Sequence, residues 1–252
     1  MAVSFGLKGR CALVTGAGQG LGQAMAVALA EAGADVAGAD VANMDETAAR
    51  VAAAGQRFAA ISGDLRGTAA TRRAVEQAVA ALGRLDILIN NAGIIRRADS
   101  IDFSEADWDD VVDLNLKSVF FLAQAAGRQF LAQGGGGKIV NVASMLSFQG
   151  GIRVPSYTAS KSGVLGLTRL LANEWAAKGI NVNAIAPGYM ATANTAPLRA
   201  DASRSAEILA RIPAGRWGQP DDLGGAVVFL CSTASDYVNG AVIPVDGGWL
   251  AR

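Results

Sequence analysis

Two residues with side chains suited to proton transfer, Tyr157 and Lys161, lie four positions apart in a stretch with helical periodicity. That spacing places the phenol and the amine on one face of a helix, about 6 Å apart at Cβ. An unperturbed tyrosine has a pKa near 10, so it acts as a base at neutral pH only if its phenolate is stabilised. A lysine ammonium in a partly desolvated site supplies energy of that order. The pair therefore predicts acid–base chemistry, although this spacing alone is common by chance.

Two further polar residues strengthen this prediction. Ser144 follows the apolar run 139–143, where a hydroxyl at the end of a strand can donate to a substrate carbonyl. Asn115 lies on the apolar stripe of a predicted helix, and an unpaired buried amide costs roughly 1–3 kcal/mol. Two interpretations of Asn115 remain open. It either makes a hydrogen bond between helices, or it belongs to a kinked helix whose carbonyl holds a water leading from Lys161 to solvent.

A glycine-rich segment, residues 15–22 with the sequence TGAGQGLG, joins the first predicted strand to the first predicted helix. Its glycines fit the pattern TGxxxGxG at Gly16, Gly20 and Gly22. Such a turn lets the backbone approach a pyrophosphate, which the free N–H groups and the dipole of the helix N-terminus attract. A tight strand–helix connection is the alternative, but the flanking strand and helix favour a dinucleotide cofactor.

The choice of cofactor depends on Asp40, which lies 18 residues after Gly22 at the end of the second predicted strand. A carboxylate there accepts hydrogen bonds from the adenosine ribose and repels a 2′-phosphate. No arginine or lysine occurs at 17–19 or 39–42 to bind that phosphate. The sequence therefore predicts NAD rather than NADP, unless Asp40 is only an ordinary turn residue.

The elements that must position these residues alternate between strand and helix along the whole chain. Strands that are continuously apolar indicate burial on both faces, as in a parallel sheet. We therefore expect an α/β fold, a single doubly wound Rossmann-type domain over residues 1–252 with a seven-stranded, mostly parallel sheet flanked by helices. The least regular segment, 189–218, follows the sixth strand and is predicted to form a substrate lid. Strands are predicted at 11–14, 35–39, 58–61, 86–90, 138–143, 181–185 and 241–245, and helices from Leu21 and at 46–54, 71–82, 108–133, 157–178 and 220–230.

The composition excludes several classes of function. The 252 residues include no histidine, which rules out a Ser-His-Asp triad and histidine-ligated metals, and we expect no metal site. The 22 basic and 22 acidic residues balance, which argues against nucleic-acid binding. The two cysteines cannot form a disulfide framework, and the N-terminus lacks the pattern of a signal peptide. The uncharged stretch 179–198 holds three Asn and two Pro, which argues against a membrane span, so we expect a cytoplasmic protein.

Taken together and in order, these motifs resemble the short-chain dehydrogenase/reductase family over essentially the whole chain. The resemblance implies that Tyr157 is the acid/base, that Ser144 orients and polarises the carbonyl, and that Asn115 maintains the proton-relay water. It further implies that Lys161 lowers the pKa of Tyr157 and binds the nicotinamide ribose, and that the protein is a homotetramer. The motifs are residues 15–22, Asp64, 90–93, Asn115, Ser144, the Tyr157/Lys161 pair, and Pro187 with Gly188. The implied cofactor contacts are Gly16, Gln19, Gly20, Leu21, Gly22, Asp40, Asp64, Leu65, Asn91, Ala92, Gly93, Tyr157, Lys161, Pro187, Gly188, Met190 and Thr192.

Three segments, 145–156, 204–218 and 246–252, are similar to those of family members that oxidise a secondary hydroxyl of a deoxy-sugar acid in the breakdown of pectin-derived uronates. The resemblance thus implies an anionic sugar-acid substrate. Alternatives are a 3-oxoacyl thioester reductase, a gluconate 5-dehydrogenase, or an NAD-sensing module without catalysis. Asp40 argues against the thioester reductase, which usually uses NADPH.

An anionic substrate needs a cation, and arginine can bind a carboxylate with two hydrogen bonds. We expect Arg153 to do so, because its loop lies between Ser144 and Tyr157, with Gln149 as a further contact; the predicted substrate residues are thus Ser144, Gln149, Arg153 and Tyr157. The arginines in segments expected at the carboxyl ends of the strands are Arg96, Arg97, Arg153, Arg199, Arg204, Arg211 and Arg216.

Overall fold

The computed structural model describes residues 4–252 and contains one sheet of seven strands in the order β3-β2-β1-β4-β5-β6-β7. Every neighbouring pair is parallel, so the sheet is wholly rather than mostly parallel. Residues 1–3, which belong to the predicted domain and to the N-terminal segment considered above, lie outside the described residues. The strands are β1 (Cys11–Thr15), β2 (Asp35–Asp40), β3 (Phe58–Ser62), β4 (Ile87–Asn90), β5 (Gly137–Val142), β6 (Ile180–Pro187) and β7 (Val242–Val245).

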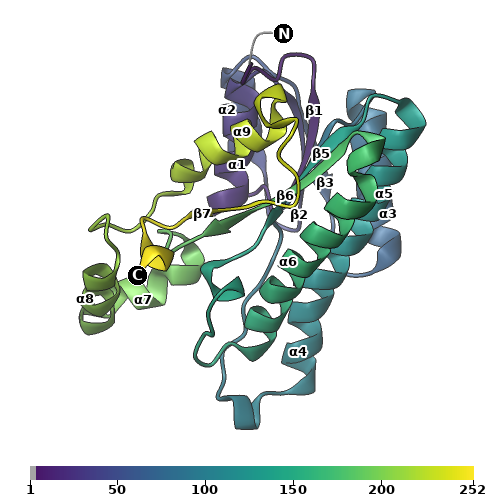
Figure 1. Cartoon of the computed structure of the whole chain (residues 1–252). Helices are drawn as coiled ribbons and strands as arrows, with labels where there is room; N and C mark the ends of the chain where they lie inside the picture. Colours follow the sequence, from purple (N-terminus) through teal and green to yellow (C-terminus); the bar gives the residue numbers. More distant parts are fainter. Residues whose placement is uncertain (1–3) are drawn as a thin grey trace.

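Helices cover both faces of this sheet (Figure 1). On one face lie α1 (Gly20–Glu31), α2 (Asp45–Ala53) and α9 (Gly224–Cys231), and on the other α3 (Thr68–Leu82), α5 (Ser118–Gln133) and α6 (Pro155–Trp175). Strand β1 shows why the strand sequences are unbroken runs of apolar residues. Its Val14 packs in the core beneath α1 and α9, and its Leu13 packs in the core beneath α3 and α5. Both faces are buried, so the polar alternation of a half-exposed strand is absent.

The seven predicted strands are confirmed to within two residues at each end, but the single helix predicted over 108–133 is wrong. The structure has α4 (Glu105–Val112), a π-helical turn at Asp113–Lys117, and then α5. The turn surrounds Asn115, which is fully buried and bonds to the backbone of Ile94. Apolar periodicity continues through such a turn, so the pattern alone predicts one unbroken helix.

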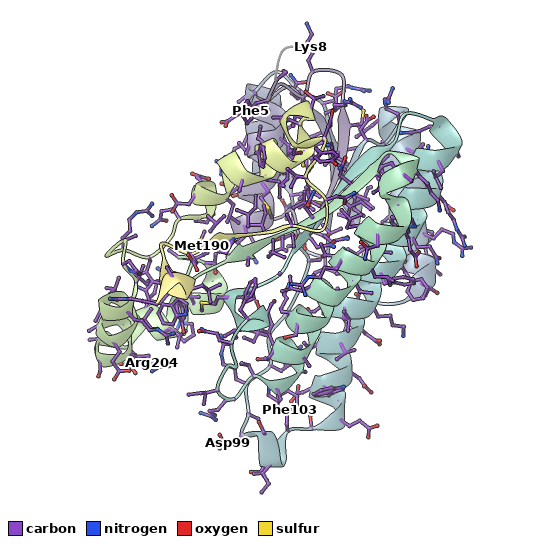
Figure 2. The ribbon with its side chains drawn as sticks, viewed as in Figure 1. Phe5, Lys8, Asp99, Phe103, Met190 and Arg204 are labelled. Carbon is purple, nitrogen blue, oxygen red and sulfur yellow. The ribbon has the colours of Figure 1, made fainter. Side chains whose placement is uncertain are left out.

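The predicted lid segment 189–218 is more regular than expected. It holds two short helices, α7 (Ala196–Ala200) and α8 (Ala202–Arg211), beside the C-terminal turn (Figure 1). Asp201 caps α8 by accepting a hydrogen bond from the backbone N–H of Arg204 at 3.0 Å. Of the ten residues of α8, Ile208 is the buried one, and it packs with Ile212 and Trp249, so α8 is an amphipathic helix lying on the C-terminal turn. Figure 2 shows Arg204 on this helix at the edge of the molecule.

Within residues 4–252, no helix combines the length and the apolar content that crossing a membrane requires. In the same part of the chain, no group of three or more cysteine, aspartate or glutamate side chains is arranged to hold a metal ion. Cys11 and Cys231 are free and buried.

Candidate active site

The site lies at the carboxyl ends of the parallel strands, beside the point between β1 and β4 where the strand order reverses. Ligands of doubly wound sheets bind in the crevice at such a point. Here the crevice is a cleft of about 530 Å³. All the predicted cofactor residues line it, as do Ser144, Tyr157 and Lys161. Asn115, Gln149 and Arg153 do not belong to its lining.

The glycine loop between β1 and α1 is shaped for close backbone approach. Gly16 has φ of 68° and Gly20 has φ of 57°, the left-handed region that favours glycine. A Cβ on Gly22 would lie 1.9 Å from the carbonyl oxygen of Gly16, so the helix start and the loop touch backbone to backbone. Gln19 precedes α1 without capping it, which leaves first-turn N–H groups available to an anion. The loop fits a dinucleotide pyrophosphate.

Hydrogen bonds tie this loop to the segment after β4. The Oγ1 of Thr15 accepts from the backbone N–H groups of Asn91 at 2.9 Å and Ala92 at 3.0 Å. The side-chain amide of Asn91 donates to the carbonyl oxygen of Thr15 at 2.9 Å. The two loops that border the middle of the cleft are therefore one bonded unit.

Two carboxylates stand along the cleft. Asp40, at the end of β2, accepts from the backbone N–H of Gly18 at 2.8 Å and of Ala42 at 2.9 Å. Asp64 accepts from the guanidinium of Arg66, and that hydrogen bond holds the pKa of Asp64 below its usual range. Arg66 lines the cleft and also pairs with Asp110 on α4. The sequence gives no signal for Arg66 beyond its position next to Leu65.

The predicted catalytic residues come together at the end of β5. Ser144 follows this strand, and its Oγ accepts from the backbone N–H of Leu146 at 3.1 Å. Tyr157 and Lys161 come from α6, where the Nζ of Lys161 lies 5.8 Å from the centre of the tyrosine ring. Lys161 is 4% exposed, and its Nζ donates to the carbonyl oxygen of Val142 at 2.6 Å. The amine is therefore fixed between the helix and the strand.

Burial shifts the pKa values of both groups toward their neutral forms. It raises the pKa of Tyr157, opposed by a hydrogen bond with Ser144 and by the positive charge of Arg97. It lowers the pKa of Lys161 to about 8. Desolvation is the largest influence on the pKa of Tyr157, and the positive charge that opposes it comes from Arg97, so the lowering by Lys161 that the resemblance implies is not seen.

Asn115 acts on the loop after β4. Its Oδ1 accepts from the backbone N–H of Ile94 at 2.9 Å, and its Nδ2 donates to the carbonyl oxygen of Ile94 at 2.8 Å. The side chain therefore bonds to a loop rather than to a second helix, and it lies in a distorted turn, as the second interpretation expects. A Cβ on Gly93 would approach the Oδ1 to 3.1 Å, so this loop packs closely on the turn.

The structure does not bring Arg153 into the cleft. Its Nε lies 3.0 Å from a carboxylate oxygen of Asp99, and its φ of 63° places an exposed loop in the left-handed region. Gln149 accepts from Arg211 at 3.3 Å, outside the cleft lining. Arg97 does not line the cleft either, but it donates to the carbonyl oxygen of Asn194, which does, at 3.2 Å, and its positive charge opposes the rise in the pKa of Tyr157. Four of the seven arginines pair with carboxylates, namely Arg96, Arg153, Arg204 and Arg216.

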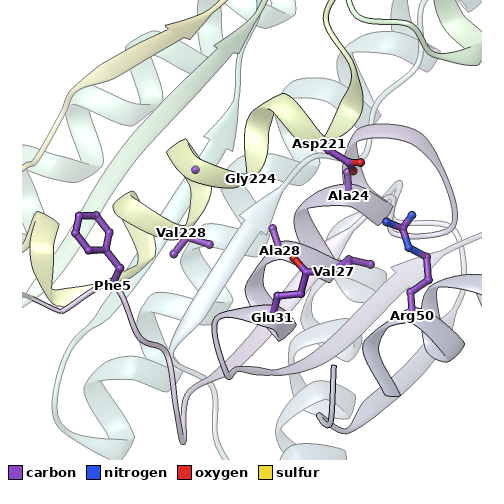
Figure 3. Close-up of a pocket in the computed structure, with 10 residues that line it drawn as sticks. Phe5, Ala24, Val27, Ala28, Glu31, Arg50, Asp221, Gly224 and Val228 are labelled. Atoms are coloured by element: carbon purple, nitrogen blue, oxygen red, sulfur yellow. The ribbon is translucent and has the colours of Figure 1, made fainter. Parts of the chain in front are cut away.

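A second hollow of about 530 Å³ lies between α1 and α9 (Figure 3). Phe5 stands at one end and Arg50 at the other, with Val27 and Val228 between them. None of the predicted site residues line it. The catalytic set therefore belongs to the first cleft.

Comparison with known proteins agrees with this geometry. A family model described as enoyl-(acyl carrier protein) reductase matches residues 16–250. The 2-dehydro-3-deoxy-D-gluconate 5-dehydrogenases of Escherichia coli and Dickeya dadantii are each 64% identical to this chain over 249 residues, covering 99% of it and 98% of theirs. A crystal structure described as a 2-deoxy-D-gluconate 3-dehydrogenase from Agrobacterium tumefaciens, with bound NADP, is 60% identical with a TM-score of 0.92 and covers 98% of this chain and 99% of that one.

The lowered pKa of Lys161 predicts a pH-dependent stability. Below about pH 8 the folded chain carries a buried ammonium, whereas the unfolded lysine keeps a pKa near 10.4, so the charge opposes folding by about 3 kcal/mol. Between these values the unfolded chain binds more protons, and the free energy of unfolding rises with pH. Lys161→Met removes the buried ammonium and with it this pH-dependent cost to the free energy of unfolding. Urea unfolding at about pH 7 and pH 10 should show the variant's advantage over the wild type shrinking as pH rises.

The exposed Lys8 (Figure 2) provides the control, because Lys8→Met removes an ammonium that solvent already surrounds. A stability difference for Lys161→Met that stays constant across this pH range would contradict the lowered pKa.

Proposed function

The chain belongs to the short-chain dehydrogenase/reductase family of oxidoreductases that act on CH–OH groups, and we propose that its substrate is a deoxy-sugar acid. The proposed reaction interconverts the secondary hydroxyl and the ketone of 2-dehydro-3-deoxy-D-gluconate or 2-deoxy-D-gluconate. One observation carries the proposal: Ser144, Tyr157 and Lys161 converge in the same cleft as the glycine loop. The sequence identity of 64% and 60%, over nearly the whole chain, to dehydrogenases with these names supports the choice of substrate.

We propose that the glycine loop, Asp40, Lys161 and Pro187–Gly188 would hold a nicotinamide dinucleotide, which would supply the hydride acceptor for the alcohol carbon. In this direction Tyr157 acts as the phenolate, its own proton having passed to solvent, and it accepts the proton of the hydroxyl. In the reverse direction, the phenol of Tyr157 donates its proton to the carbonyl oxygen as the hydride arrives at carbon. Burial favours the protonated phenol, which suits this role as the acid.

Ser144 and Lys161 position these transfers. The Oγ of Ser144 accepts from a backbone N–H, and its hydroxyl also hydrogen-bonds with Tyr157, so it lies where it would donate to the reacting oxygen. Lys161 has one donor fixed on Val142 and two more N–H groups facing the cleft side of α6 when protonated. We assign these to the ribose and to a relay through the π-helical turn of Asn115.

The reaction is tested by following NADH formation with purified protein. NAD should be reduced with 2-dehydro-3-deoxy-D-gluconate or 2-deoxy-D-gluconate, and not with D-gluconate or a 3-hydroxyacyl thioester. Tyr157→Phe should lower kcat by about 10²–10⁴-fold, the usual contribution of a general acid–base group, while NADH fluorescence titration shows unchanged cofactor binding. Turnover of the thioester alone, or a fully active Tyr157→Phe variant, would contradict the proposal.

For the cofactor we propose NAD. Both carboxylate oxygens of Asp40 are held by backbone N–H groups at the rim of the cleft, where the ribose of the adenosine would lie. The exposed Val41 that follows offers no charge to a 2′-phosphate. Several solved relatives contain bound NADP, so the preference of this chain between the two cofactors is the measurement that tests the proposal.

We expect kcat/KM for NAD to exceed that for NADP by about tenfold or more, because like charges at close range cost at least 1–2 kcal/mol. Asp40→Asn keeps the shape of the side chain and removes its charge. It should therefore reduce the ratio of kcat/KM for NAD to that for NADP about tenfold, by lowering the KM for NADP. Asp45→Asn, at an exposed carboxylate on α2, serves as the control. A wild-type preference for NADP would contradict the assignment.

For the substrate carboxylate we propose Arg97 in place of Arg153. Its positive charge opposes the rise in the pKa of Tyr157, it is bonded to Asn194 in the cleft lining, and among residues 4–252 no carboxylate pairs with it. Its bond to Asn194 uses a single N–H group and joins it to the lid segment. The guanidinium therefore keeps donors for a carboxylate near the reacting carbon.

Arg97→Met should raise the KM for the sugar acid by about tenfold or more, the cost of losing a charged hydrogen bond, with NADH binding unchanged. Arg153→Met is the matched control and should change the KM by less than about threefold. Steady-state kinetics on both variants decides between them, and a larger effect at Arg153 would reverse the assignment.

We further propose a homotetramer, and a place in the cytoplasmic breakdown of pectin-derived uronates. The exposed leucines on the outer faces of α5 and α6, Leu131 and Leu170, support an interface between copies. Free, buried cysteines suit a reducing compartment.

A further inference from the structure

One peptide group in the glycine loop, the link between Ala17 and Gly18, is held at both ends. Its carbonyl oxygen, on Ala17, accepts from the Oγ1 of Thr47 at 2.7 Å. Its N–H, on Gly18, donates to the Oδ2 of Asp40 at 2.8 Å. A side chain of α2 and a side chain at the end of β2 thus fix the plane of a single peptide bond.

The direction of the Thr47 hydrogen bond is fixed by its other neighbour. Thr47 is fully buried, and its Oγ1 also accepts from the Nε2 of Gln23 at 3.0 Å. The Oε1 of the same amide accepts from Arg50 at 3.4 Å, so the amide turns its N–H group toward the hydroxyl. An amide N–H only donates, so the single proton of Thr47 goes to Ala17.

Packing prevents this peptide from relaxing if a bond is lost. Ala17 is fully buried. A Cβ on Gly18 would lie 3.0 Å from Asp40 Oδ2, 3.0 Å from the carbonyl oxygen of Asn43 and 3.1 Å from Ala42. If the peptide turned over, its carbonyl oxygen would face the Asp40 carboxylate, and the two would repel. The orientation of the peptide and the position of that carboxylate are therefore linked.

From this geometry we infer that Thr47 is a positioning residue for dinucleotide binding. Through the Ala17–Gly18 peptide it holds the loop between Gly16 and Gly20 in shape and keeps Asp40 directed at the ribose. The inference rests on the proposed function, since it presumes that the cleft binds a dinucleotide. Thr47 does not line the cleft and lies on α2, apart from Ser144 and Tyr157. It therefore governs the affinity for the cofactor and not the rate of the chemical step.

The test compares Thr47→Val, which removes the hydroxyl at nearly constant volume, with Thr47→Ser, which retains it. Thr47→Val should raise the Kd for NADH, measured by fluorescence titration, and the KM for the oxidised cofactor by about tenfold. The kcat should stay within about twofold of the wild type, and Thr47→Ser should restore most of the affinity.

Thr71→Val is the control for a purely structural effect. Thr71 is 1% exposed, its hydroxyl donates to the carbonyl oxygen of Thr68 at 2.9 Å in α3, and it does not line the cleft. It should lose stability without losing NADH affinity. Equal NADH affinity in Thr47→Val and Thr71→Val would overturn the inference, as would a loss of kcat without a change in Kd. A wild-type protein that binds neither NADH nor NADPH would instead refute the proposed function.

Discussion

The dehydration of the Tyr157–Lys161 pair is the constraint on which the rest of the site depends. A buried amine is tolerated only with a partner, and the carbonyl oxygen of Val142 at the end of β5 provides it at 2.6 Å. That bond requires α6 to lie across the end of the sheet, which in turn presents the phenol to the cleft. Desolvation keeps both groups toward neutrality, with the pKa of Lys161 lowered to about 8. The site therefore holds a protonated phenol that can donate its proton, beside an amine that loses its proton more easily than a free lysine does.

The parallel sheet explains why such different residues meet. Thr15, Asp40, Asn90, Val142 and Pro187 end five strands at one edge, and each is followed by a segment that lines the cleft. The loops are then fixed largely by hydrogen bonds between the backbone and the side chains of Thr15, Asn91, Asn115 and Thr47, with Arg66 adding ion pairs to Asp64 and Asp110. Polar side chains of this kind fix the shape of a loop without leaving a buried polar group unpaired, because each one hydrogen-bonds to a buried backbone group. Cofactor binding and catalysis thus rest on the same framework.

The sequence predicts most of this arrangement, and its failures have physical causes. Strand positions follow from apolar runs buried on two faces, and the cleft residues follow from motifs that end those strands. The π-helical turn escapes prediction because apolar periodicity continues across Asn115. The lid helices are missed although α8 is amphipathic and is capped by Asp201, because the rest of segment 189–218 is irregular. The position of Arg153 between Ser144 and Tyr157 favours it as the carboxylate ligand, but the fold directs it to Asp99, and only tertiary structure reveals that the charge of Arg97 acts on the pKa of Tyr157.

The central claim, that burial controls the acid–base pair, is tested most directly by titrating the phenol of Tyr157 itself. The ultraviolet difference spectrum between the wild type and Tyr157→Phe isolates this phenol from the other two of the three tyrosines. In the ligand-free protein, the account predicts ionisation above the ordinary tyrosine pKa of about 10. Ionisation near neutral pH would contradict it, and would show that the charge of Lys161 rather than desolvation governs the site.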